Sequence, residues 1–282
     1  MNKFKITNLA IIAVIGIVVF LSECQKAKLN KETVSAEDNA TAENLFTDIF
    51  KIIDDMAKNE PGIGKTGSSA NGSCAIVTLT PPLPDSTFPK TVLIDFGSSN
   101  CTGTDGRERR GKIIAVFSGR YYVAGTVITI STDDFYVDDN KIDGIKIITN
   151  NGRNSAGNLS FTIKVDDGMI ITSSGDTILW ETTRTAEWVA GESTTPPPIT
   201  YICDDVYEIT GYASGVNRNG REFTMNITQA LVKKICCKWI VSGTVEITPK
   251  DLNKRTIDFG DGDCDNKATV MIKKRTFNII LR

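Results

Sequence analysis

The densest group of potential metal ligands in this chain is a run of carboxylates near its end, in the segment DFGDGDCD. The run consists of Asp258, Asp261, Asp263 and Asp265. Calcium binds six to eight oxygen atoms in proteins, and closely spaced aspartates are a frequent source of them. The segment lacks the closing glutamate of an EF-hand loop, and turns also favour aspartate. Two interpretations therefore stand side by side, a polar turn and a calcium site, and no other cofactor is predicted.

Cysteine spacing is the second pattern with chemical meaning. Cys74 and Cys101 lie 27 residues apart, and Cys237 and Cys264 have the same separation. An Ile-Asp-Phe-Gly sequence precedes the second cysteine of each pair, at a constant offset of 163 residues. This coincidence predicts an internal repeat, in which each disulfide joins two neighbouring strands. The repeat nominates the disulfides Cys74–Cys101 and Cys237–Cys264.

Two further cysteines, Cys203 and Cys236, are left to pair with each other by default. Cys236 and Cys237 are adjacent and could exchange partners, so the bridge from Cys203 can end at either of them. The absence of a Cys-x-x-Cys sequence argues against a redox-active site. Disulfides form and persist outside the cytoplasm, so this framework indicates an exported protein.

Composition excludes several kinds of chemistry. The chain of 282 residues contains no histidine, so serine–histidine and cysteine–histidine catalysis and histidine-containing zinc sites are excluded. Its 32 basic and 34 acidic residues leave no excess of positive charge for nucleic-acid phosphates. Paired carboxylates can hydrolyse glycosidic bonds, so a carboxylate-dependent hydrolase acting on glycans is the alternative to a non-catalytic protein.

The N-terminus has the features of a secretion signal. Two lysines precede an uncharged apolar run, residues 9–21, which is shorter than the about 20 residues that span a bilayer. The tetrapeptide Leu-Ser-Glu-Cys that ends at Cys24 resembles the lipobox of bacterial lipoproteins, with Glu23 where a small residue is usual. The resemblance implies a signal peptide over residues 1–23 and lipid attachment at Cys24. Because Gln25 rather than aspartate follows the cysteine, the resemblance also implies that the lipoprotein is located in the outer membrane.

Hydrophobic periodicity predicts the elements that position these residues. Residues 24–42 are polar and without period, which predicts a flexible tether. Apolar residues recur at three- and four-residue spacing over residues 41–58, which predicts an amphipathic helix. Beyond Cys74, β-branched residues alternate with polar ones, which predicts strands. Asp167-Gly168 stands between two such runs and is predicted to form a tight hairpin turn.

We expect a mainly β fold of antiparallel sheets, meander- or sandwich-like, with two related disulfide-linked halves and one N-terminal amphipathic helix. The helix and the first half occupy residues 43–190, and the second half occupies residues 201–282. A proline-rich segment, residues 191–200, is the candidate linker, because proline cannot donate to a strand ladder. One continuous domain is the alternative to two separate halves.

Several segments carry a likeness to known sequences: residues 94–97, 111–114, 135–137, 141–144, 243–248 and 258–266. With the cysteine after each Ile-Asp-Phe-Gly, they resemble a group of uncharacterised envelope lipoproteins of Bacteroidetes. The resemblance covers most of the chain beyond Cys74. It implies a location in the cell envelope and a β fold, and it implies no activity.

Together these patterns predict a non-catalytic lipoprotein of the outer membrane with a binding or structural role. Its lipid would hold it at the membrane, and the expected partner is a glycan or an envelope protein. Aromatic side chains could stack on sugar rings, although packing in the core is their commoner use. The candidates are Trp180, Trp188, Tyr121, Tyr122 and Tyr201.

Overall fold

The computed structural model describes residues 32–60, 62–63, 75–194 and 203–281. Within them the chain forms one α-helix, α2 (Val34–Asn59), a 3-10 turn, η1 (Glu192–Thr194), and a series of strands. The strands are β1 (Ile76–Thr80), β2 (Lys90–Asp95), β3 (Cys101–Thr102), β4 (Glu108–Phe117), β5 (Val127–Val137), β6 (Asn140–Arg153), β7 (Leu159–Ile171), β8 (Thr177–Ala190), β9 (Val206–Val216), β10 (Glu222–Lys234), β11 (Ser242–Pro249), β12 (Arg255–Asp261), β13 (Lys267–Ile272) and β14 (Arg275–Ile280).

These strands form one antiparallel sheet whose spatial order follows the chain from β1 to β14, with the short β3 set beside β4. The predicted mainly β class and the antiparallel meander are confirmed. The described strands make one curved sheet rather than two facing sheets. β8 and β9 pair along their length on either side of the proline-rich segment, so the sheet continues across the predicted linker.

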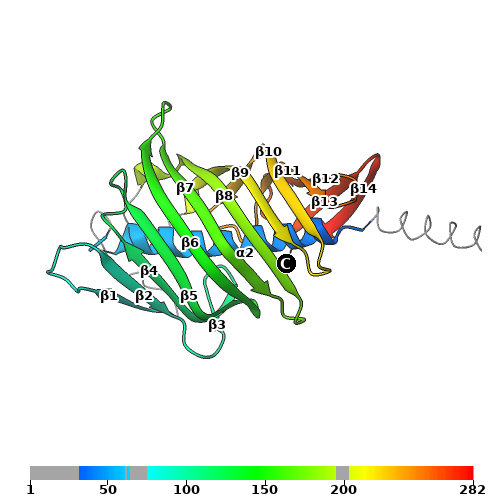
Figure 1. Cartoon of the computed structure of the whole chain (residues 1–282). Coiled ribbons are helices and arrows are strands. Elements are labelled where there is room, and N and C mark those ends of the chain that lie inside the picture. Colours follow the sequence, from blue (N-terminus) through cyan, green and yellow to red (C-terminus); the bar gives the residue numbers. More distant parts are fainter. Residues whose placement is uncertain (1–31, 61, 64–74, 195–202, 282) are drawn as a thin grey trace, which may run out of the picture.

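The sheet curves around α2, which lies along its concave face (Figure 1). Of the 26 residues of α2, 20 are buried. Strand residues alternate between a buried inner face and an exposed outer face, as the pattern of β8 shows clearly. The core therefore lies between the helix and the inner face of the sheet, and the outer face meets solvent.

The helix begins earlier than the sequence predicts. It starts at Val34, so residues 34–42 belong to α2 and not to the predicted tether. Their contacts with the sheet include polar ones: Asn217 donates to the Ser35 hydroxyl, and the Trp180 ring nitrogen donates to Asn39. A period of large apolar residues marks a helix that buries them, whereas this first part buries alanines and polar side chains.

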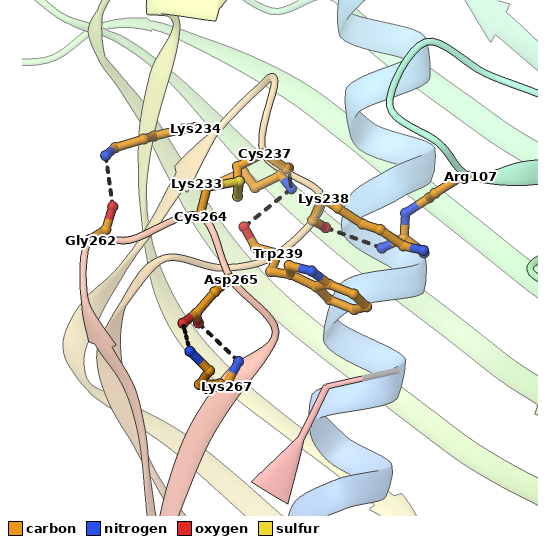
Figure 2. The surroundings of a disulfide bond; sticks show 10 residues. All are labelled: Arg107, Lys233, Lys234, Cys237, Lys238, Trp239, Gly262, Cys264, Asp265 and Lys267. Carbon is orange, nitrogen blue, oxygen red and sulfur yellow. Dashed lines mark hydrogen bonds and ion pairs between the residues drawn. A yellow bond between two sulfur atoms is a disulfide. The ribbon is translucent and has the colours of Figure 1, made fainter.

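Two connections from distant parts of the curved sheet meet beside the helix. Arg107, just before β4, donates through Nη2 to the Lys238 carbonyl at 3.1 Å, and Lys238 lies between β10 and β11. Asp138, between β5 and β6, pairs with both Arg107 and Lys238. Figure 2 shows Arg107 and the Trp239 ring together beside the helix. Strands β4 to β10 and these contacts therefore enclose α2 at this point.

The described cysteines agree with the disulfide framework. Cys237 bonds to Cys264, as the spacing predicts, with 5.6 Å between the Cα atoms (Figure 2). Cys203 bonds to Cys236, which resolves the choice between the two adjacent cysteines. Cys101 is also disulfide-bonded. Cys74 and Cys24 lie outside the described residues, so the pairing Cys74–Cys101 and the lipid attachment stay predictions.

The two Asp-Phe-Gly segments have the same local structure. The Asp95 carboxylate accepts a hydrogen bond from the Gly97 amide at 2.8 Å, and the Asp258 carboxylate accepts one from the Gly260 amide at 2.9 Å. Both glycines have positive φ, 80° and 95°, which glycine adopts without strain. The local match is consistent with a repeated unit, and the common origin of the two halves stays a prediction.

Candidate functional site

The run of four aspartates lies at the end of β12 and in the connection to β13. The Asp258 carboxylate caps its own turn, as described above. The Asp265 carboxylate accepts from the Lys267 amide and pairs with the Lys267 ammonium, each at 3.0 Å. In the described part of the chain, no three His, Cys, Asp or Glu side chains are gathered so that they could hold a metal ion. These are the contacts of a polar turn, and calcium binding stays a prediction.

Three of the five aromatic side chains proposed for sugar stacking belong to the core. Trp180, Trp188 and Tyr121 are each 2% exposed or less. Tyr122 is partly buried and packs on that core, while Tyr201 lies outside the described residues. Sugar stacking needs an exposed ring face, which these three buried rings do not offer.

Acidic side chains also meet inside the core, where α2 faces β9. The Lys58 ammonium pairs with Asp54 at 2.7 Å and with Asp205 at 2.9 Å, and lies 3.6 Å from the Trp188 ring centroid. Tyr207 donates to Asp54 at 2.9 Å. Burial raises the pKa of Asp205 to about 6, against the opposing pull of the Lys58 charge.

This cluster has the side chains of an acid–base site, but a substrate has no access to them. The side chains of Lys58, Asp54 and Asp205 are each 1% exposed. A general acid must lie within hydrogen-bond reach of its substrate, and no substrate reaches these carboxylates in this structure. The cluster fixes the end of α2 to the sheet.

A groove of about 930 Å³ lies on the outer face of the sheet. It runs mainly across six neighbouring strands, from β6 to β11, near one end of each, and Ser131 of β5 also lines it. Its volume lies within the range of ligand-binding sites in proteins, about 300 to 1,000 Å³. Because α2 covers the inner face, a ligand would reach the described sheet from its outer face, where this groove lies.

Glycines let the strands bend under the groove. Gly168 pairs with Trp180, and Trp180 pairs in turn with Gly215 on the far side. A Cβ atom on Gly168 would lie 2.2 Å from the Trp180 carbonyl oxygen and 3.1 Å from the Phe46 ring. The Trp180 ring stacks on Phe46 of the helix, with ring centroids 5.3 Å apart. The groove therefore has a floor of strand backbone supported by a filled core.

The bulge at this glycine corrects one prediction. Asp167-Gly168 is not a hairpin turn, because β7 runs without interruption from Leu159 to Ile171. The register shifts between Val165 and Gly168, where β7 carries a bulge opposite β8. Asp167 has a φ of 52°, so the local backbone is turn-like although the strand continues. Bulges re-aim side chains and bend strands, and this one shapes the groove.

The side chains around the groove are aliphatic and acidic. Ile145 and Leu179 are each 45% exposed. Four acidic residues and one lysine also line the groove: Asp143, Asp167, Glu181, Glu222 and Lys250. The sequence signal that could have located it is the set of glycines inside predicted strands, which often mark bulges or close approaches.

Comparison with known proteins adds no family. The chain matches no protein-family model, and neither the curated proteins nor the solved structures contain a significant match. The described helix, α2, lacks the length of apolar sequence that a bilayer crossing requires.

Proposed function

We propose that this protein is a non-catalytic binding lipoprotein of the outer membrane. Lipid on Cys24 anchors it, and the groove across β6–β11 is its ligand-binding surface. The single observation that carries the binding role is this groove, which is open, apolar in part and charged. Its residues sit on paired strands over a filled core, so the surface is formed before a ligand arrives and binding costs little ordering.

The proposed location in the cell envelope rests on the N-terminal sequence. An apolar run too short for a membrane span, followed by a cysteine in a lipobox-like context, supports lipidation at Cys24. The disulfides of the second half support folding in an oxidising compartment.

The carboxylate-hydrolase alternative receives no specific support from the geometry. The best-defined meeting of two acids, Asp54 with Asp205, is closed to solvent and bridged by Lys58. In a structural or binding protein, the same cluster has a function without access to a substrate, because it attaches the helix to the sheet.

The experiment is a glycan array and an envelope pull-down with the full-length protein in detergent. Wild type is compared with Leu179→Glu, which places a charge in the groove, and with Val116→Glu, an outer-face control at 37% exposure against 45% for Leu179. We expect a ligand that binds wild type and the control but not Leu179→Glu. Equal binding by all three proteins, or hydrolysis of a bound glycan, would contradict the proposal.

A further inference from the structure

We infer that the ligand of the groove is a basic polypeptide segment that carries aliphatic side chains. The inference rests on the proposed binding function and names its ligand class. It follows from the charge, the exposed apolar atoms and the length of the groove.

The charge around the groove is predominantly negative. The one lining lysine, Lys250, is already paired with Glu222 at 2.9 Å. Asp167 and Glu181 form neither a hydrogen bond nor an ion pair with any described side chain, although the charge of Glu181 interacts with that of Lys164. The nearby Lys164 lies outside the lining and is paired with Asp166 at 2.8 Å. A cationic ligand is the electrostatic complement of this surface.

The apolar part of the groove is aliphatic. Ile145 and Leu179 expose nearly half of their surface each, and Met169 and Val216 lie beside them, partly buried. The aromatic residues of the lining, Trp180 and Phe223, are only 2% and 3% exposed. Proteins commonly bind the apolar faces of sugar rings by stacking exposed aromatic rings on them. This lining exposes no aromatic ring, so it favours a ligand with aliphatic side chains over a sugar.

The groove is long enough for a peptide. Neighbouring strands lie about 4.8 Å apart, so a groove across six strands extends roughly 24 Å. An extended chain covers about 3.3 Å per residue, which gives room for about seven residues. Side chains alternate along an extended segment, so lysines or arginines can face the acids while aliphatic residues meet Ile145 and Leu179.

The test measures binding of labelled peptides to the full-length protein in detergent by fluorescence anisotropy. The probes are an alternating Lys-Leu nonapeptide, the matched Glu-Leu and Gln-Leu peptides, and an unlabelled glycan mixture as competitor. We expect the Lys-Leu peptide to bind most tightly and to weaken as salt is raised from about 50 to 500 mM, because the acids are exposed. The glycan mixture is expected not to displace it.

Variants locate the binding. Asp167→Asn combined with Glu181→Gln should weaken the Lys-Leu peptide about 3- to 10-fold, since each exposed charge pair contributes modestly. Leu179→Thr should weaken both the Lys-Leu and the Gln-Leu peptide. The matched controls are Glu208→Gln, an exposed acid on β9 outside the groove lining, and Val116→Thr, and both should bind as wild type does.

The outcomes separate the two proposals. Equal affinity for the Lys-Leu and Glu-Leu peptides, or no effect of the paired acid substitutions, overturns the basic-peptide inference. The basic-peptide inference is also overturned if a glycan displaces the peptide and Leu179→Thr no longer binds that glycan. In that case the binding function of the groove stands. If no ligand depends on any groove residue, the proposed function falls as well. Thermal unfolding of each variant shows that the fold is intact.

Discussion

Arg109 of β4 forms a bidentate ion pair with Asp48 near the middle of α2. Its Nε lies 2.9 Å from Oδ2 of Asp48, and its Nη2 lies 2.6 Å from Oδ1. The two side chains are only 6% and 3% exposed. Asp105 contacts the same guanidinium at 2.7 Å. Burial opposes the charge of Asp105, but Arg109 and Lys51 outweigh it and hold the pKa of this carboxyl well below its usual range.

Such pairs recur along the helix. Arg184 of β8 contacts Glu43 at 2.6 Å, and the Arg218 guanidinium forms an ion pair with Asp38, whose carboxylate also accepts a hydrogen bond from the Arg218 backbone amide at 2.7 Å. A buried ion pair contributes little net stability compared with apolar packing, but it is costly to break from one side. The pairs therefore define where the helix sits and at which register, while the apolar residues of the core supply most of the stabilising free energy.

We first predict that Arg109→Met lowers the free energy of unfolding by about 3 to 5 kcal/mol, because Asp48 and Asp105 lose a buried partner. Arg110→Met is the control, since Arg110 pairs with Asp139 at the surface and should cost at most about 1 kcal/mol. Urea denaturation measures both. Adding Asp48→Asn to Arg109→Met should recover part of the loss. Equal losses in the two single variants would refute the structural role of the pair.

A second prediction concerns pH. Lys146 is buried, donates to the Phe46 carbonyl of the helix, and forms no ion pair with a described carboxylate. Burial lowers its pKa to about 7, although Glu43 and Asp48 oppose the shift. In the unfolded chain the pKa returns to about 10.4, so between these values the unfolded state binds more protons and stability rises with pH.

Lys146→Met should remove the contribution of Lys146 to this dependence, while the buried Lys233, whose pKa burial also lowers to about 7, keeps its own. The variant should be more stable than wild type near pH 6, by up to about 4 kcal/mol, and the difference should shrink toward pH 10. Denaturation with urea at pH 6, 8 and 9.5 measures it, with Lys164→Met as an exposed control. A difference that is the same at all three pH values would show that Lys146 is charged throughout.

The third prediction concerns the Cys237–Cys264 disulfide, which closes 27 residues and holds the turn that carries Trp239. In the chain-entropy picture a loop of this length is worth about 3 to 4 kcal/mol. Replacing both cysteines by alanine should lower the free energy of unfolding by that amount. Peptide mapping under non-reducing conditions should recover Cys203 bonded to Cys236, and recovery of Cys203 with Cys237 would contradict the structure.

The fourth prediction tests the anchor. Cys24→Ser should abolish incorporation of labelled fatty acid and move the protein from the membrane fraction to the soluble fraction. The matched control is Ser22→Ala, which keeps the cysteine. Continued membrane association of Cys24→Ser without lipid would show that another part of the chain holds the protein at the membrane.

Much of the candidate site could not be predicted from the sequence. The groove forms where residues far apart in the chain, such as Ile145 and Leu179, come together on one outer face. Asp167-Gly168 has the composition of a hairpin turn, and only the long pairing of β7 with β8 makes it a bulge. The early helix residues were missed because their partners, Arg218 and Asn217, lie some 180 residues away.

The sequence by itself determined the strand-rich class, the meander and the Cys237–Cys264 bond, because alternation and cysteine spacing are local or repeated patterns. It also determined the absence of histidine chemistry. The tertiary structure alone decided that one sheet encloses one helix, that the Trp180 ring faces inward, and that the outer face is hollowed across β6–β11. These features depend on strand curvature and on buried ion pairs between distant residues, and neither leaves a period in the sequence.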